Sequence, residues 1–242
     1  MERSIEAYDL PERSAGYDRD MEILHPNRAK MVEVVLEFLA QAGEEPGLAI
    51  DLGAGAGFVA ERFLRRFPRS RLVAIDGAPS MTALAKTRLG MLAERVDFHI
   101  ADFREIGRIP GLAPVDAVVS SFALHHLGLE DKRSVLASSA ALLRPGGWFL
   151  NADLVVAESS EVEAVIQRIR VEGIVRRAEG VDDRFRDLSS TRRFLDDLEV
   201  REGDRPLTLS QDVALLKGAG FENVSLLWQE YREAVTAGRR PD

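Results

Sequence analysis

Over residues 48–154 the chain alternates between two patterns of hydrophobic and polar positions. Short apolar runs, such as Leu48, Ala49 and Ile50, are typical of strands that are buried on both faces. Between them, apolar residues recur every three or four positions, which predicts helices that pack by one side. The strands are predicted within residues 48–51, 71–76, 95–103, 115–120 and 148–154. Such an alternation predicts an α/β fold with a doubly wound, mostly parallel sheet.

Beyond residue 154 the pattern adds helices and two final strands. Residues 221–228 and 231–236 have the pattern of a strand pair, which brings the predicted sheet to seven strands. Residues 158–200 hold two helical patterns and a charged stretch, and they are longer than an ordinary connection between strands. We therefore expect a helical insertion over the carboxyl ends of the strands, where it would select the substrate.

The N-terminal region is polar, and residues 1–25 are predicted in isolation to form a mobile arm. A helix is predicted to follow it, because Met31, Val34 and Val35 begin an apolar repeat that ends before Gly43. The chain contains no repeats and no low-complexity segments. Residues 1–242 are therefore predicted to form a single domain.

Three glycines directly follow the first predicted strand. Gly53, Gly55 and Gly57 lie between Asp51 and an amphipathic segment, which predicts a strand, a tight turn and a helix. Glycine suits a loop that a ligand approaches closely, because it has no Cβ. The spacing differs from the Gly-x-Gly-x-x-Gly of dinucleotide sites, and the carboxylate of Asp51 would repel a pyrophosphate. The loop is therefore predicted to bind a cofactor that carries an ammonium or sulfonium group.

This stretch, Asp51-Leu-Gly-Ala-Gly-Ala-Gly, resembles the first motif of class I methyltransferases that depend on S-adenosylmethionine (SAM). Residues 121–127 are similar to the family's fourth motif, and residues 143–147 to the turn before its fifth strand. From residue 10 onwards the layout is similar to a subgroup of carboxy-SAM synthases and tRNA wobble-uridine methyltransferases, except that Asn27 and Arg28 replace an aromatic residue. The resemblance implies a Rossmann-like methyltransferase fold, with SAM as cofactor and S-adenosylhomocysteine as product.

The cofactor-binding residues are predicted at the ends of the first four strands. Asp76 lies within the roughly 20-residue interval expected between a glycine loop and a ribose-binding acid, and its carboxylate can accept from both ribose hydroxyls. The resemblance implies that Met81 lies against the adenine, and that Asp102 and the backbone of Phe103 contact adenine nitrogens. The predicted set is Asp51, Gly53, Ala54, Gly55, Asp76, Gly77, Met81, Asp102, Phe103, Ser120 and Ser121.

The resemblance also implies that residues of about 1–42 close over the cofactor as a lid. Tyr17 and Arg28 would then contact cofactor or substrate, and a solvated surface position is the alternative for each. Arg193 aligns with an arginine that clamps a carboxylate in carboxy-SAM synthases, since a guanidinium fits a carboxylate bidentately. It would bind substrate from its own chain or from the partner in a homodimer, or else lie on the solvated surface.

His125 and His126 lie in the fourth motif, where the methyl donor and acceptor meet in the family. Methyl transfer from a sulfonium is an in-line displacement that requires alignment of the reacting atoms. It needs no metal ion, and none is predicted. A base is required only if the nucleophile arrives protonated, so the two histidines are predicted either as that base or as packing residues of the cofactor pocket.

Composition narrows the classes of partner. The chain has 32 basic and 40 acidic residues and a net charge of −8, which disfavours nucleic acid as a partner. It has no cysteine, which excludes disulfides, thiolate metal sites and a cysteine nucleophile. No apolar run approaches the roughly 20 residues of a membrane span, and the N-terminus lacks a signal-peptide pattern. A cytoplasmic protein without a membrane partner is predicted.

The chain is therefore predicted to transfer a methyl group from SAM to a small-molecule acceptor. One alternative is an enzyme that modifies SAM itself, as carboxy-SAM synthases do. The other is a SAM-binding protein without catalysis, because cofactor-binding residues alone do not distinguish an enzyme from a sensor.

Overall fold

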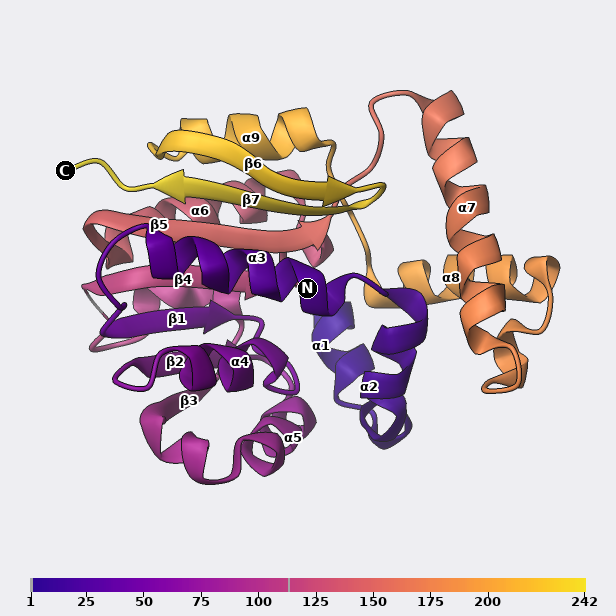
Figure 1. Ribbon diagram of the computed structural model, residues 1–242, viewed down its shortest axis with the longest axis horizontal. Coiled ribbons are helices and arrows are strands. Elements are labelled where there is room, and N and C mark those ends of the chain that lie inside the picture. The colour runs from indigo at the N-terminus through magenta and orange to yellow at the C-terminus, as the bar shows by residue number, and fades with distance from the viewer. Residues whose placement is uncertain (1, 113) are drawn as a thin grey trace.

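The computed structural model describes residues 2–112 and 114–242, and it is built on one seven-stranded sheet (Figure 1). The strand order is β3-β2-β1-β4-β5-β7-β6, with β7 antiparallel to β5 and the first five strands parallel. This confirms the predicted doubly wound α/β fold. The strands are β1 Leu48–Leu52, β2 Arg71–Asp76, β3 Val96–Ile100, β4 Val115–Ser121, β5 Leu143–Leu154, β6 Glu222–Glu230 and β7 Glu233–Arg239.

Helices cover both faces of the sheet because successive residues of each central strand point to opposite sides. In β1, Ala49 belongs to the hydrophobic cluster on one face, whereas Ile50 and Leu52 belong to the cluster on the other. The first face is covered by α3 Arg28–Gln41, α4 Phe58–Arg66 and α5 Pro79–Leu89. The second is covered by α6 Leu129–Leu142 and α9 Leu209–Gly218.

The N-terminal region folds as two helices, α1 Glu2–Tyr8 and α2 Pro11–Leu24, so the prediction of a mobile arm was wrong. The physical reason is tertiary burial, because Met21 packs against the residues that follow β2, and Leu24 joins the core of the insertion. A polar segment with few apolar residues gives little local sign of such contacts. Only the rest of the molecule supplies them.

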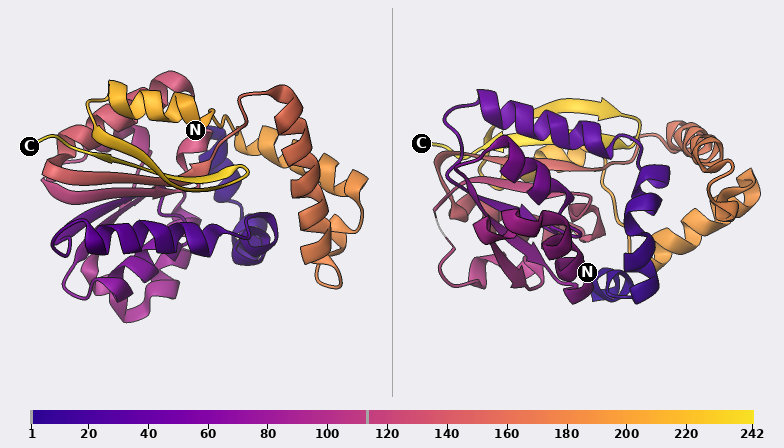
Figure 2. Two further views of the ribbon diagram at one scale, coloured as in Figure 1. Left: turned by 45° about the horizontal axis from the view of Figure 1, so that its top comes forward. Right: turned by 60° about the horizontal axis from the view of Figure 1, so that its bottom comes forward.

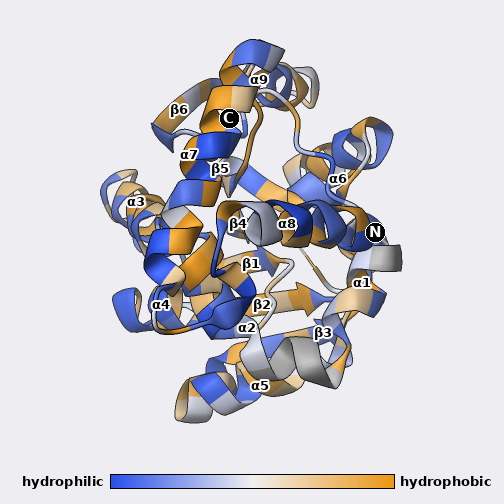
Figure 3. Ribbon diagram, turned by 90° about the vertical axis from the view of Figure 1, so that its right-hand side faces the viewer, coloured by the Kyte–Doolittle hydropathy of each residue, from blue (hydrophilic) through white to orange (hydrophobic). Residues whose placement is uncertain are grey.

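The insertion consists of α7 Ser160–Ala178 and α8 Leu188–Glu202. Together with α1 and α2, these helices gather beyond the end of the sheet toward which β1 points, to the right of Figure 1 and in both views of Figure 2. Hydrophilic and hydrophobic residues alternate along α7 and α8 (Figure 3). No helix within residues 2–112 and 114–242 is long and apolar enough to cross a membrane.

The short connections include four 3-10 helices. They are η1 Gly90–Arg95, η2 Phe103–Arg108, η3 Leu124–His126 and η4 Asp183–Phe185. The turn predicted over residues 144–147 is instead a bulge within β5, since Leu143 pairs with Val115 and Trp148 pairs with Ala117. Gly146 accommodates the bulge with a φ of 77°.

A buried ion pair joins the two helices on the second face. Lys132 of α6 is 2% exposed, and its Nζ lies 3.0 Å from Oδ1 of Asp212 in α9. Burial raises the pKa of Asp212, and the charge of Lys132 opposes that shift. Each charge therefore depends on the other for its stability in the core.

We predict that Lys132→Met lowers the free energy of unfolding by about 3–5 kcal/mol, because it leaves the Asp212 carboxylate buried without its cation. The double variant Lys132→Met/Asp212→Leu should recover most of that loss, since neither charge then remains. Urea unfolding followed by circular dichroism measures both values. A double variant no more stable than Lys132→Met would contradict this account of the pair.

Candidate functional site

The glycine loop after β1 has a backbone conformation that a residue with a side chain would adopt only with strain. Gly53 and Gly55 have φ angles of 70° and 50°, in the left-handed region. A Cβ on Gly53 would lie 2.4 Å from the Cβ of Ala123, which follows β4. The amides of Gly53 and Ala54 both donate to the carbonyl of Ile75 in β2. The loop is therefore held between the ends of three neighbouring strands.

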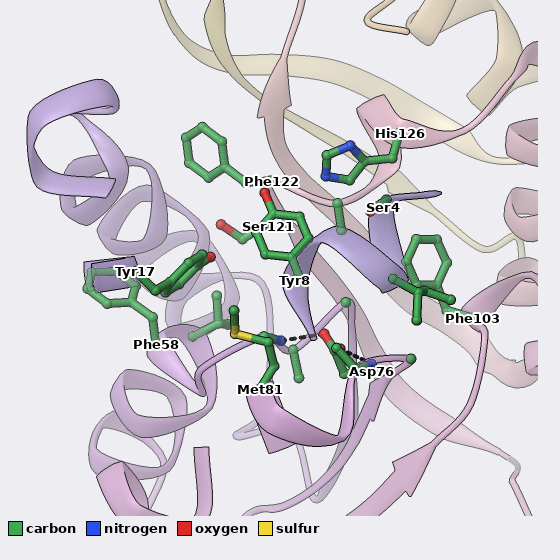
Figure 4. Close-up of a pocket in the computed structure, with 18 of the residues that line it drawn as sticks. Ser4, Tyr8, Tyr17, Phe58, Asp76, Met81, Phe103, Ser121, Phe122 and His126 are labelled. Carbon is green, nitrogen blue, oxygen red and sulfur yellow. Dashed lines mark hydrogen bonds between the residues drawn. The ribbon is translucent and has the colours of Figure 1, made fainter. Parts of the chain in front are cut away.

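Asp76 at the end of β2 is bonded to this loop. Its Oδ2 accepts from the amide of Gly55 at 2.7 Å, and its Oδ1 accepts from the amide of Ala78 at 2.9 Å (dashed in Figure 4). Burial raises the pKa of this carboxyl, and the two amide donors oppose the shift. A carboxylate oxygen can accept more than one hydrogen bond, so Asp76 keeps capacity for a ligand's hydroxyl groups.

Asp51 lies under the loop and is fully buried. Both of its carboxylate oxygens are buried without a hydrogen-bond partner anywhere in the described part of the chain. Burial raises the pKa of Asp51 to about 7, and repulsion from Asp76 adds to the shift while Arg28 opposes it. A buried carboxylate without a donor is costly, so this position favours a ligand that brings a cationic donor.

A cavity opens above the loop, at the carboxyl ends of the strands (Figure 4). Tyr8 of α1 reaches into its centre, with its ring centroid 6.0 Å from that of Tyr17 and 5.8 Å from that of His126. The predicted site residues that line the cavity are Tyr17, Arg28, Gly53, Ala54, Gly55, Asp76, Gly77, Met81, Phe103, Ser121 and His126. The fold thus brings together predicted site residues from well-separated segments of the chain.

Two helices of the N-terminal region cover this cavity. A Cβ on Gly77 would lie 2.5 Å from Cδ1 of Ile5, so α1 sits directly on the end of β2. The guanidinium of Arg28 stacks over the rings of Phe58, at 3.9 Å, and Tyr17, at 5.3 Å. Of the two readings weighed for Tyr17 and Arg28, the solvated surface does not fit this packing. Their contact with cofactor or substrate stays a prediction.

The other predicted site residues, Asp51, Asp102, Ser120, His125 and Arg193, do not line the cavity. Ser120 is buried and donates from its hydroxyl to the carbonyl of Leu52. Both carboxylate oxygens of Asp102 accept from Arg104, so in this structure its side chain is turned toward that arginine. Arg193 is exposed on α8 and does not line this cavity. The cofactor and substrate contacts predicted for these three residues stay predictions.

The histidines of the fourth motif have different surroundings. Nδ1 of His125 lies 2.5 Å from Oδ1 of Asp153, at the end of β5, and the backbone amide of His125 donates to the other oxygen of that carboxylate. Burial lowers the pKa of His125, but the charges of Asp153 and Asp204 outweigh it and the net shift is upward. The pKa of His126 is lowered by burial and by repulsion from His125.

Sequence reasoning missed several residues that complete the cavity. Tyr8, Phe122 and Ala123 line it, and Phe122 has a φ of 50°, which is rare for a side chain of its size. Asp153 ends a strand as Asp51 and Asp76 do, and that shared position was a usable signal. Nothing in the sequence around Asp204 indicates that it lies beside the histidines.

Comparison with known proteins now identifies the family. Residues 49–147 match the model of a methyltransferase domain. The chain is 30% identical over 174 residues to an uncharacterised methyltransferase of Geobacillus kaustophilus, a match that covers 71% of this chain and 70% of that protein. The chain belongs to the SAM-dependent methyltransferase family.

Two further similarities extend over more of this methyltransferase. A carboxy-SAM synthase of Shewanella loihica is 24% identical over 230 residues, covering 93% of this chain and 89% of the synthase. An O-methyltransferase family protein from Burkholderia thailandensis has a similar fold, with a TM-score of 0.69 and 19% identity. That match covers 98% of this chain, which spans 62% of the solved chain. The fold and the family predicted from the sequence are confirmed.

The raised pKa of Asp51 gives a stability prediction for the methyltransferase without ligand. The folded state holds a proton on Asp51 up to about pH 7, whereas the unfolded chain loses it near pH 4. The contribution of Asp51 to stability is therefore present at low pH and is lost as the pH rises toward 7. Between pH 5 and pH 8 the loss amounts to about 2.5 kcal/mol.

Because an asparagine side chain does not titrate, Asp51→Asn should gain stability over the wild type by about that amount as the pH rises from 5 to 8. Urea unfolding of both proteins across this pH range measures the difference in their free energies of unfolding. Taking this difference cancels the contributions of the titrating groups that the two proteins share. A difference that stays constant with pH would show that the Asp51 carboxyl has an ordinary pKa.

Proposed function

We propose that the chain binds SAM above its glycine loop and transfers the methyl group to a small-molecule acceptor. The observation that carries the proposal is the buried Asp51 carboxylate, whose two oxygens lack a donor beneath the loop among the described residues. The methionine part of SAM carries an α-ammonium group, which is a cationic donor. The buried carboxylate lacks a donor, and the cofactor carries a cationic one that could supply it.

The remaining residues of the cavity suit the other parts of the cofactor. Asp76 offers a carboxylate for the ribose hydroxyls, at the end of the strand next to the loop. Met81 and Phe103 offer apolar surface in the cavity for a flat ring. Gly53 and Gly55 leave room for a ligand to approach the backbone, because they have no Cβ.

When bound, SAM supplies a methyl group on a positively charged sulfur, and the protein's part is to align the acceptor with it. Tyr8, Tyr17 and Phe122 surround the cavity with aromatic surface that excludes water. Of the two predicted catalytic histidines, only His126 lines this cavity, so only His126 could contact an acceptor there. The catalytic role of the pair stays a prediction.

A second cavity supports an acidic group on the acceptor. It lies between the end of β5, α7 and the turn from β6 to β7. Its wall includes Arg170, Arg176 and Arg177, of which Arg170 is paired with Glu199, and also Arg232, Glu230 and Glu233, so arginines outnumber glutamates. His25 lines this cavity, and its ring contacts that of Phe122 of the first cavity at a tilt of 52°, with centroids 4.6 Å apart. One layer of rings therefore separates the proposed cofactor site from a basic cavity. Arginines bind carboxylates and phosphates well because of their planar fork of donors.

The carboxy-SAM synthase alternative has its own support. The similarity to the Shewanella loihica synthase extends over 93% of this chain, and that enzyme's name describes a carboxylated cofactor. The same arginines would then bind the acid that modifies the cofactor, rather than an acceptor. Mass spectrometry of the nucleoside that copurifies with the chain distinguishes the two, because carboxy-SAM is heavier than SAM by the mass of its carboxylate.

We predict that Asp76→Ala weakens the binding of S-adenosylhomocysteine by roughly 30- to 1,000-fold, because two charge-assisted hydrogen bonds to the ribose are lost. Asp76→Asn, which keeps one acceptor oxygen, should have an intermediate affinity. Asp97→Ala is the matched control, since Asp97 is exposed on β3 and pairs with His99 away from the cavity. Isothermal titration calorimetry measures all four affinities, and equal values for wild type and a folded Asp76→Ala would contradict the ribose assignment.

Methyl transfer itself is tested with SAM that carries a radioactive methyl group and a set of small acidic acceptors. We expect labelled product from at least one acid, and we expect Arg176→Ala to raise KM for that acid by about tenfold. Arg168→Ala is the control, because Arg168 is exposed on the same helix but does not line the basic cavity. A KM that changes equally in both variants would exclude a specific role for Arg176.

A further inference from the structure

Three possible metal ligands converge beside the first cavity. His125 and His126 belong to η3, and Asp204 follows α8 in the loop that leads to α9. One ligand atom from each lies within 4.8 Å of the others. Oδ1 of Asp204 is 2.9 Å from Nδ1 of His126 and 3.6 Å from Nε2 of His125. Ligand atoms about 2.05 Å from a tetrahedral zinc ion lie about 3.3 Å apart, so the two separations from Asp204 are close to those of such a site.

The first histidine is held as a metal-binding histidine usually is. Asp153 accepts from the backbone amide of His125 and contacts its Nδ1, and the amide of Leu154 fixes the same carboxylate. In the neutral ring, a proton on Nδ1 would be shared with Asp153, and Nε2, 3.6 Å from Oδ1 of Asp204, would keep its lone pair for a metal ion that displaces the second proton. A carboxylate behind a histidine in this way sets the tautomer and the orientation of the ring for a metal ion.

The loop that carries Asp204 is tied to the histidines by its own backbone. The amide of Arg205 donates to the carbonyl of His125, and the amide of Val156 donates to the carbonyl of Leu207. These bonds connect the loop to η3 and to the end of β5. The carboxylate of Asp204 is therefore positioned beside the histidines without a flexible arm.

Several buried polar atoms of this cluster have no hydrogen-bond partner among the described residues, as is expected of atoms that bind a metal ion. His126 is 4% exposed, and within the described residues both of its ring nitrogens are without a hydrogen-bond partner, as is Oδ1 of Asp204. Buried polar atoms normally have partners, so these three atoms need an explanation. Oδ1 of Asp204 and Nδ1 of His126 lie 2.9 Å apart, close enough for both atoms to bind one ion.

Charge in this region also favours a cation. Asp153 and Asp204 carry two negative charges, and Glu202 lies nearby, where it accepts from the hydroxyl of Tyr8. Lys132 of α6, whose charge also acts on Asp153, is already paired with Asp212. A divalent ion would balance the two carboxylates that face the histidines.

We propose that His125, His126 and Asp204 bind one divalent transition-metal ion, with Asp153 orienting His125. Two imidazoles and one carboxylate in a tetrahedral arrangement are typical of zinc, with the fourth position open to a ligand. His126 also lines the first cavity, so the open position faces that side. The ligand class is an oxygen donor, such as a hydroxyl or carboxylate, and its identification with the methyl acceptor rests on the proposed function.

The test uses the full chain with any polyhistidine tag removed, stripped of metal with EDTA and then dialysed. Titration with Zn²⁺ in a calorimeter should show one ion per chain, and Asp204→Asn should weaken binding by at least 10- to 100-fold. His99→Gln is the matched control, because His99 also lies against a carboxylate, Asp97, but on exposed β3. Loading with Co²⁺ should give visible absorption bands of a low-coordinate site in the wild type and in His99→Gln only.

Binding of S-adenosylhomocysteine and thermal melting are measured on the same samples, which shows that each variant is folded. His126→Gln serves as a second variant if Asp204→Asn does not fold. Equal Zn²⁺ affinity in the wild type and the ligand variants, or less than one ion per wild-type chain, would overturn the metal site. A chain that binds Zn²⁺ stoichiometrically but not S-adenosylhomocysteine supports the metal site and overturns the proposed cofactor, so the two failures are separable.

Discussion

The organisation of this site depends on one buried carboxylate. Asp51 is fully buried near the end of β1, and its oxygens lack donors within the described residues. A charge in that position destabilises the free protein, which is why its pKa rises to about 7. The cost becomes useful when a cationic ligand arrives, because the ion pair then forms in a medium of low dielectric constant. Under the proposed function, the stability of the free protein and the affinity for the cofactor are therefore opposed at Asp51.

Three aspartates lie near the carboxyl ends of the parallel strands, and they differ in how many hydrogen bonds they accept. Asp51, Asp76 and Asp153 each lie at the last or next-to-last position of a strand; Asp51 and Asp153 are buried, and Asp76 is partly buried. Asp76 is partly satisfied by two loop amides, and Asp153 is satisfied by a histidine and two amides. The degree to which each carboxylate is satisfied therefore separates a ligand contact from a positioning contact.

The helices beyond this end of the sheet form the walls of two cavities at the carboxyl ends of the strands. Residues of α1 and α2 line the first cavity. The insertion supplies Arg170, Arg176 and Arg177 of the second cavity, and the loop that follows it carries Asp204. These segments share a hydrophobic cluster in which Ile23 and Leu24 of α2 pack with Ile174 of α7 and Leu195 of α8. Packing between the N-terminal helices and the insertion thus determines the shape of the site, and not only its stability.

The sequence by itself determined the sheet, its helices and the glycine loop, because their signals are local. A buried strand needs a run of apolar residues, and a loop with φ angles above zero needs glycine at Gly53 and Gly55, whatever lies elsewhere. It also predicted that Asp51 and Asp76 lie near one another at the carboxyl ends of neighbouring strands, since parallel strands bring those ends to one edge; of the two, Asp76 lines the first cavity. The predicted turn over residues 144–147 failed, because a bulge in a paired strand and a turn before it have the same local sequence.

Only the tertiary structure decided how the polar segments of the chain fold and what they contact. Residues 2–24 form helices because distant residues bury them, and no local pattern reports a distant partner. The same holds for Asp204, whose carboxylate meets His126 only because backbone bonds return its loop to β5. The position of a charge along the chain is local information. Whether that charge is buried, and beside which other group, depends on the whole fold.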